Sequence, residues 1–183
     1  MPDPWIIGQN VPWNAAWSAE ESFEVRNCRW AEGKPALWQP HKPGQGRPIF
    51  AKPHNVRQRQ SIAEMRCTVC GQKTPTHDRF WFGLGREIDG WFMTTEAPVH
   101  HACARLAEAM CPHICRQNLR ANPMPPPDLV FAAIVGGPVT DRDFGLNLNG
   151  RKVVGHLKLA WRPSRSLADH LARCEKMKGT QNA

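Results

Sequence analysis

Two pairs of potential metal ligands constrain this chain more than any other feature. Cys67 and Cys70 form a CxxC pair followed by Gly71, and a second pair lies further along in the segment His100-His101-Ala102-Cys103. Two thiolates at CxxC spacing hold one side of a Zn²⁺ ion, and a second pair at i and i+3 closes the tetrahedron. The sequence therefore predicts a core organised around one structural zinc ion.

Two adjacent histidines compete for the fourth ligand position. In the first turn of a helix, residues i and i+3 share a face, whereas residues i and i+2 diverge by roughly 200°. This spacing favours His100 as the partner of Cys103, and it leaves His101 exposed at the helix N-terminus. The predicted Zn²⁺ ligands are therefore Cys67, Cys70, His100 and Cys103, with His101 as the alternative to His100.

A further group of potential ligands, Cys111, His113 and Cys115, follows the second pair. Cys111 lies eight residues beyond Cys103, which is about 12 Å along a continuous helix, so these two thiols cannot bind one ion. A second zinc would have to recruit ligands from distant parts of the chain. A small buried thiol at the end of a helix is the more common case.

The segments around the ligands predict a known zinc arrangement. Residues 55–66 predict a basic helix with Asn55 as its N-cap, and residues 78–95 predict a hairpin or two short strands. A helix from Cys103 should stop near Cys111, because Pro112 follows. We therefore predict an α+β fold with a small zinc-stabilised treble-clef-like core, made of knuckle, hairpin and helix. The 17 prolines and 14 glycines indicate short flanking strands and irregular Pro- and Trp-rich segments.

Composition divides the chain into four segments. They are a Pro- and Trp-rich segment with short strands (1–54), the basic helix with the zinc module (55–121), C-terminal strands and a helix (122–176), and a disordered tail (177–183). Residues 129–135 predict a buried strand, and residues 153–159 predict a second strand. Because two isolated strands would be only marginally stable, we expect them to complete a sheet begun by the N-terminal strands. Most of the tryptophans are expected in the core.

Positive charge gathers next to the predicted zinc module. The net charge is +8, and residues 41–66 carry one acid, Glu64, against six bases: Lys42, Arg47, Lys52, Arg57, Arg59 and Arg66. A basic cluster beside a zinc finger is typical of proteins that bind a phosphate backbone. We therefore predict nucleic acid, DNA or RNA, as the partner. The predicted phosphate contacts are Lys52, Arg57, Arg59 and Arg66.

The N-terminus and the cysteine count bear on the compartment. The N-terminus lacks a basic region followed by an apolar run, and the longest apolar stretch, 129–135, is too short to span a bilayer. Seven cysteines, an odd number with one CxxC pair, fit reduced thiolate ligands better than a disulfide framework. We expect a soluble cytoplasmic protein with no membrane partner.

An ordered set of motifs gives this chain a resemblance to a known group of proteins. The motifs occupy residues 12–20, 46–54, 57–59, 67–71, 100–104 and 111–112. Together they resemble a family of uncharacterised proteins from actinobacterial genomes and their phages, over residues 12–165. In that family the second ligand pair is usually two cysteines, so His100 departs from its pattern. The resemblance implies a phage or mobile-element context and a zinc-bound core, and it implies no reaction. If the protein is phage-encoded, we expect it in the cytoplasm of the host cell.

Three functions are compatible with these features. Nucleic-acid binding is favoured, and a phage factor that docks on a host protein through its Trp-rich N-terminus is the main alternative. A nuclease of the ββα-metal, HNH-like type is the third, but it needs a general-base histidine and an open metal position. His113 and Asn118 lack the expected spacing, and the P-loop, GxSxG, GxGxxG and zinc-deaminase patterns are absent. The sequence thus favours a protein that is not an enzyme.

Overall fold

One mixed β-sheet collects strands from the N-terminal, central and C-terminal parts of the chain. The computed structural model describes residues 5–179, and its main sheet has the strand order β2-β3-β10-β7-β6, with β9 paired to β10. The strands are β2 (Glu24–Asn27), β3 (Pro35–Trp38), β6 (Arg86–Ile88), β7 (Trp91–Thr94), β9 (Leu129–Val135) and β10 (Val153–Trp161). The prediction that the C-terminal strands complete a sheet begun by N-terminal strands is confirmed.

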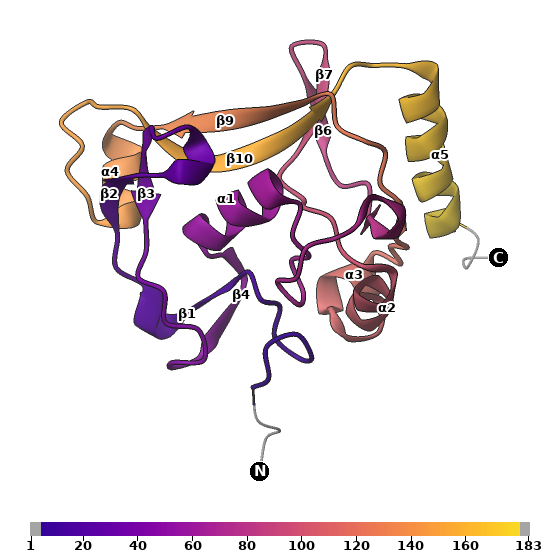
Figure 1. Ribbon diagram of the computed structural model, residues 1–183, viewed down its shortest axis with the longest axis horizontal. Helices are drawn as coiled ribbons and strands as arrows, with labels where there is room; N and C mark the ends of the chain where they lie inside the picture. Colours follow the sequence, from indigo (N-terminus) through magenta and orange to yellow (C-terminus); the bar gives the residue numbers. More distant parts are fainter. Residues whose placement is uncertain (1–4, 180–183) are drawn as a thin grey trace.

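Helices and two small sheets surround this main sheet. The small sheets pair β1 (Ala15–Trp17) with β4 (Pro48–Pro53) and β5 (Phe80–Trp81) with β8 (Asn122–Pro123). The helices are α1 (Asn55–Glu64), α2 (His101–Met110), α3 (Pro112–Arg116), α4 (Pro138–Phe144) and α5 (Arg165–Gly179). Figure 1 shows β9 and β10 along one side of the molecule, α1 beneath them, and α2 and α3 at the far corner. The predicted α+β fold class is confirmed.

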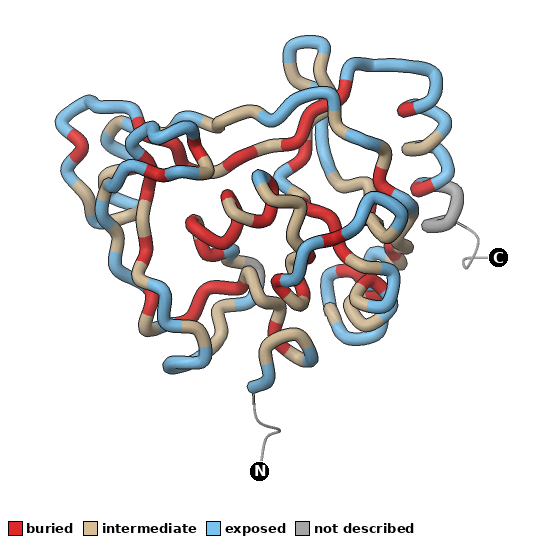
Figure 2. The backbone as a smooth tube through the Cα atoms, in the orientation of Figure 1, coloured by how far each residue is buried: buried red, intermediate tan, exposed pale blue. Residues whose placement is uncertain are grey.

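The central strand β10 separates a core face from an outer face by simple alternation. Leu157, Leu159 and Trp161 are buried and pack in the main hydrophobic cluster, which also holds Ile62 of α1. His156 and Lys158 point to the opposite side and are half-buried. The buried stretches of β10 and α1 appear as neighbouring red segments in Figure 2. The sheet therefore has one face covered by α1 and another that carries polar side chains.

Side chains of α1 close a gap in the main sheet. Along one edge, β10 pairs with β3 at Val154 and with β7 only from Leu159 onward. Between these two points, the Gln58 amide donates to the Leu157 carbonyl at 2.8 Å and accepts from the Leu157 N–H at 3.0 Å. Arg59 donates to the Gly155 carbonyl at 2.7 Å and to the Leu37 carbonyl. Because unpaired buried backbone groups are costly, these two side chains stabilise the sheet.

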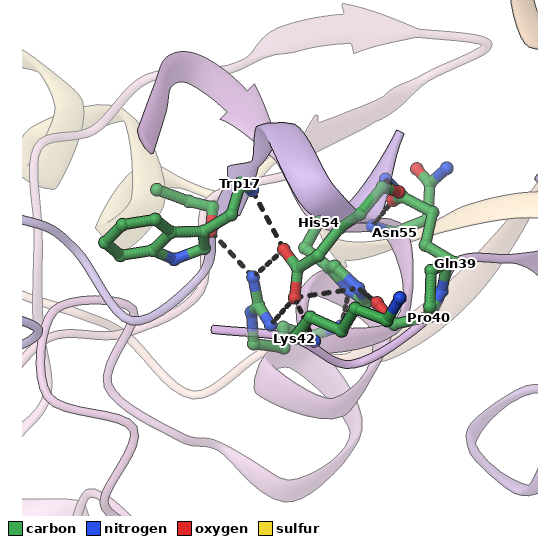
Figure 3. A network of polar contacts seen from close by, with 9 residues as sticks. Trp17, Gln39, Pro40, Lys42, His54 and Asn55 are labelled. Carbon is green, nitrogen blue, oxygen red and sulfur yellow. Dashed lines mark hydrogen bonds and ion pairs between the residues drawn. The ribbon is translucent and has the colours of Figure 1, made fainter. Parts of the chain in front are cut away.

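Arg57, which directly precedes Gln58 in α1, is also buried and forms an ion pair with Glu20. Figure 3 shows the polar network around this pair, including Trp17, Lys42 and His54. Its two terminal nitrogens donate to both carboxylate oxygens of Glu20 at 2.8 and 2.7 Å, and Nη2 also donates to the Ala15 carbonyl at 2.7 Å. The Trp17 and Lys42 N–H groups donate to the same carboxylate. Burial alone would raise the pKa of Glu20, but the hydrogen bonds from Arg57 and Lys42 outweigh it and hold the pKa below its usual value. The ion pair ties α1 to the 3-10 turn Ser18–Glu20, and the bond to Ala15 ties α1 to β1.

Burial of Arg57 and Arg59 overturns two of the predicted phosphate contacts. Both side chains are 0% exposed, and their terminal nitrogens are bonded to protein oxygens. Arginine is almost never fully buried without partners, and here the partners lie far away in the sequence. The predicted helix is thus present, but Arg57 and Arg59 stabilise the protein interior and are not available to a phosphate.

His54, not the predicted Asn55, is the N-cap of α1. Its Nδ1 accepts a hydrogen bond from the Arg57 N–H at 3.3 Å, and its Nε2 donates to the Pro40 carbonyl at 3.0 Å. Burial and the charge of Arg57 lower the pKa of His54 to about 4. The ring is therefore neutral near pH 7, which leaves Nδ1 free to accept from the helix.

The strand β9 forms where predicted, but it is not buried as predicted. Leu129, Val130 and Ile134 keep 45%, 48% and 53% of their surface exposed. Among the described strands β9 pairs only with β10. It is therefore an edge strand, and its other edge has no strand beside it among the described residues. An uncharged apolar run does not distinguish a central strand from an edge strand.

The C-terminal end differs in part from the prediction. Residues 177–179 of the predicted disordered tail belong to α5, and residues 180–183 lie outside the described residues. Within residues 5–179, no helix combines the length and the apolar character needed to cross a membrane.

Candidate functional site

The turn after α1 presents the first pair of ligands. A bridge joins Arg66 and Lys73, and the Cys67 N–H donates to the Gln72 carbonyl at 2.8 Å. The turn closes with the Gly71 N–H on the Cys67 carbonyl at 2.8 Å, and Gly71 has a φ of +78°. A side chain at this glycine would also meet the Trp13 ring, since an added Cβ would lie 2.7 Å from it. Gly71 therefore permits the tight turn that presents the two thiols.

The N-terminus of α2 presents the second pair. Phe80 and Val99 exchange two backbone hydrogen bonds of 2.8 and 2.9 Å, which brings the start of α2 next to the turn. His100 is the N-cap of α2, and Cys103 lies in its first turn. Knuckle, strand pairing and helix thus follow the treble-clef order that the sequence predicted.

Four ligand atoms meet between these two elements. The Sγ atoms of Cys67, Cys70 and Cys103 and a ring nitrogen of His100 all lie within 4.8 Å of one another. The His100 Nδ1 lies 3.4 Å from the Cys70 Sγ and 3.9 Å from the Cys103 Sγ. Zinc bonds of about 2.3 Å to sulfur and about 2.0–2.1 Å to nitrogen place tetrahedral ligand atoms about 3.6–3.8 Å apart. The cluster can therefore hold a metal ion, and its spacing suits a tetrahedral one.

The protonation chemistry of the thiols agrees with a cation at this place. Burial raises the pKa of Cys67, although backbone N–H groups lower it in part. Burial and then the neighbouring Cys67 and Cys70 raise the pKa of Cys103. Cys67 and Cys103 therefore resist deprotonation when only protein surrounds them, and a divalent metal ion removes this penalty by binding the thiolates.

The outer nitrogen of His100 has a backbone partner. Its Nε2 donates to the Lys73 carbonyl at 3.2 Å, which leaves Nδ1 without a proton and directed at the thiols. A metal-bound histidine almost always donates its second ring N–H to an acceptor of this kind. The hydrogen bond therefore orients the imidazole as a ligand.

His101 lies outside this cluster, so the preference for His100 is supported. The His101 ring stacks near Phe80 with centroids 4.7 Å apart, and its backbone N–H bonds to Asp78. The other suspected ligands are also apart: the Cys115 thiol donates to the Glu108 carbonyl, and His113 contacts Gln117. Among the described residues, the only group of three or more potential ligand side chains is Cys67, Cys70, His100 and Cys103.

The two remaining predicted phosphate contacts lie at the surface, but each has an acidic partner. Lys52 bonds to Glu21 at 3.1 Å, and Arg66 bonds to Glu64 at 2.6 Å. Arg66 also donates to the Gly71 carbonyl at 3.0 Å, so it stabilises the turn that holds Cys67 and Cys70. The predicted basic surface next to the metal therefore carries less free positive charge than the sequence indicated.

A second group of positive side chains lies on the outer face of the main sheet. The register places Lys158 opposite Phe131, and Met93 opposite Ala160 and Arg86, so these side chains share one face. We call this surface the sheet platform; it consists of Arg86, Trp91, Met93, Phe131, His156, Lys158 and Arg162. Sequence reasoning missed it, although His156 and Lys158 alternate with the leucines of β10 in the period of a strand.

Aromatic rings and cations alternate on the sheet platform. Trp91 and Phe131 meet edge to face with centroids 5.8 Å apart, and the Arg162 guanidinium lies 5.3 Å from the Trp91 ring. Arg86 and Arg162 are exposed, and Lys158 is half-buried. None of these three cations is in an ion pair with a described residue. The surface is therefore positive and partly aromatic.

A hollow of about 450 Å³ opens beside these residues, lined by Arg86, His156 and Lys158 together with Glu96. Burial raises the pKa of Glu96 to about 7, in spite of hydrogen bonds to its oxygens from the N–H groups of Phe82 and Leu84. A carboxyl group that is partly protonated near pH 7 opposes an anion less than an ordinary carboxylate does. The hollow is thus basic on balance.

Comparisons of the whole chain with protein-family models, with curated proteins and with solved structures found no match. A function for this chain is therefore inferred from the geometry of the metal cluster and of the sheet platform.

Proposed function

We propose that this chain is a zinc-binding protein of phage or mobile-element type that binds nucleic acid through the sheet platform. The observation that carries the proposal is the set of three cations, Arg86, Lys158 and Arg162, which share one face and whose side chains form no ion pair with a described residue. Such cations replace counterions along a phosphate backbone. The phage context rests on the resemblance of the sequence motifs.

Zinc is the proposed metal because of the ligand set. Three thiolates with one imidazole suit Zn²⁺ better than Mg²⁺ or Ca²⁺, which prefer oxygen ligands. Four protein ligands complete a tetrahedron and leave no position for a reacting water. The bound ion would therefore cross-link the turn at Cys67 and Cys70 to the first turn of α2. This supports a structural role, and we propose no nuclease or other reaction at the site.

Salt dependence of binding tests the nucleic-acid proposal. Replacing Arg86, Lys158 and Arg162 together by alanine should lower affinity for a short oligonucleotide and reduce the slope of log K against log salt. The expected reduction is about 0.7 to 0.9 per lost phosphate contact, or about 2 to 3 in total. Fluorescence anisotropy between 50 and about 200 mM salt measures both quantities.

A control with the same change of charge separates a site from general attraction. Arg26, Lys34 and Arg142 each pair with an acid at the surface, so their triple alanine variant loses three charges elsewhere. It should keep most of the salt slope of the unaltered protein. Equal losses in the two triple variants, or no salt-dependent binding at all, would exclude the sheet platform as the site.

A protein partner is the second candidate, and one surface favours it. Trp5 and Phe50 meet edge to face at 5.7 Å, and each keeps 50% of its surface exposed. Phe50 also lines an apolar hollow of about 340 Å³ that extends to Val69 and Ile114. Aromatic residues beside an apolar hollow are typical anchors of protein interfaces. A partner that stays bound after nuclease treatment, and is lost when Trp5 and Phe50 are replaced, would support this function.

A further inference from the structure

We infer that the sheet platform takes single-stranded nucleic acid, with bases stacked on Trp91 and Phe131. This inference rests on the proposed function, since it specifies the form of nucleic acid that the same surface binds. The observation behind it is that two aromatic rings, and not only cations, occupy the middle of the platform.

The two rings lie where bases of a strand could reach them. Trp91 and Phe131 come from β7 and β9, on either side of β10, and both are half-buried. Ala160 lies between them in the register and is fully buried, so a small residue leaves room for the two rings to meet. Each base has a planar π-face that stacks on such rings, but in a duplex these faces are already stacked.

The cations around the rings suit a backbone that runs past them. Lys158 lies directly opposite Phe131, and Arg162 lies 5.3 Å from the Trp91 ring. Arg86 lies across β7 beside the basic hollow, which gives phosphates a positive path along one side of the rings. Sheets that bind single strands combine aromatic platforms with basic grooves in this way.

The one acid that lines this hollow, Glu96, is held by backbone N–H groups of the segment between β5 and β6. The Glu96 oxygens accept from the Phe82 N–H at 2.6 Å and from the Leu84 N–H at 3.2 Å. Because these donors already hold the carboxyl group, it is directed at the chain between β5 and β6. It therefore competes little with a phosphate near Arg86 and Lys158.

A matched aromatic pair elsewhere in the chain provides the control. Trp5 and Phe50 have nearly the same edge-to-face geometry as Trp91 and Phe131, with centroids 5.7 Å apart against 5.8 Å. The nearby cation Lys52 is in an ion pair with Glu21. Trp5 thus has the same kind of ring contact as Trp91 and is more exposed, but the cation near it is already paired.

The test compares single-stranded RNA, single-stranded DNA and duplex DNA of equal length, using fluorescence anisotropy on the zinc-loaded full chain. Trp91→Leu should lower single-strand affinity about fivefold to a hundredfold, whereas Trp91→Phe should keep most of it, because one stacked base contributes about that much. Trp5→Leu should leave the affinity within about twofold. The RNA and DNA arms show which sugar the platform prefers, and circular dichroism checks that each variant folds.

The outcomes separate this inference from the proposed function. Single strands bound more tightly than duplex, with a loss specific to Trp91→Leu, support the inference. Duplex bound as tightly as single strands, or Trp91→Leu without effect while the cation variant still loses affinity, would overturn the inference and leave nucleic-acid binding in place. Absence of salt-dependent binding to every probe would overturn both.

Discussion

Replacing Cys67 by serine is expected to remove the bound zinc and to unfold the metal module. Cys67 is fully buried, and its Sγ lies within 4.8 Å of the other three ligand atoms. Structural zinc sites contribute apparent binding free energies of about 10–16 kcal/mol, which matches or exceeds the whole unfolding free energy of a typical domain, about 5–15 kcal/mol. Metal analysis should find about one zinc per chain in the unaltered protein and far less in the variant.

The loss of stability in Cys67→Ser should reach beyond the metal module, because the N-terminal segment is hydrogen-bonded to the turn that holds Cys67 and Cys70. The Trp13 N–H donates to the Val69 carbonyl at 2.8 Å, and the Asn14 N–H donates to the Thr68 carbonyl at 3.1 Å. Thermal unfolding followed by circular dichroism measures the change. Cys115→Ser is the matched control, because Cys115 is exposed and lies outside the ligand group. A Cys67→Ser variant that unfolds at the temperature of this control would contradict a structural role for the metal.

Replacing Arg57 by methionine is expected to lower the free energy of unfolding by about 3–5 kcal/mol, the usual cost of leaving a buried charge without its partner. Glu20 and Arg57 are both 0% exposed and joined by two hydrogen bonds. The substitution leaves the Glu20 carboxylate in the core with the N–H groups of Trp17 and Lys42 and the His54 ring nitrogen, 3.7 Å away, but without its charged partner. Urea or guanidinium unfolding measures the effect.

A double-mutant cycle assigns this loss to the ion pair. Glu20→Gln combined with Arg57→Met should cost clearly less than the sum of the two single variants, because each single variant leaves one partner alone. Arg142→Met is the control, since Arg142 pairs with Asp143 at the surface and exposed pairs contribute about 1 kcal/mol or less. Additive single effects, or an Arg57→Met loss as small as that of the control, would show that the buried pair does not stabilise the fold.

The group of potential metal ligands was predictable from the sequence because the geometry of each pair is local. CxxC spacing, a glycine after the second cysteine and i, i+3 spacing in a first helical turn each fix a ligand pair without knowledge of the fold. The structure brings together Cys67, Cys70, His100 and Cys103 on these grounds. That the two pairs lie next to each other could not be predicted from local spacing. It followed from the predicted treble-clef order of knuckle, hairpin and helix.

The burial of the α1 arginines was not predictable, because their partners are distant in the sequence. Arg57 bonds to Glu20 across 37 residues, and Arg59 bonds to Gly155 across 96 residues. A run of basic residues beside a predicted zinc module indicates an exposed surface unless these pairings are known. The edge position of β9 is hidden in the same way, since strand order is a property of the whole sheet.

The sheet platform could be predicted from the sequence only in part. The alternation of His156 and Lys158 with buried leucines was visible in the sequence and could have indicated a polar outer face. The neighbours of these residues were not visible, because Trp91 and Phe131 join β10 from opposite sides. The proposed binding surface therefore depends on strand order, whereas the candidate metal site depends on local spacing.

X-ray absorption at the zinc edge of the zinc-loaded protein tests most directly whether Cys67, Cys70, His100 and Cys103 form a closed structural site. The expected first shell has three sulfur ligands at about 2.3 Å and one nitrogen ligand at about 2.0–2.1 Å. The His100→Ala variant should lose the nitrogen ligand, and His101→Ala should keep it. A first shell with fewer than three sulfurs, or one that contains a water oxygen, would contradict the closed site. Such a shell would instead favour a site at which the metal can activate water.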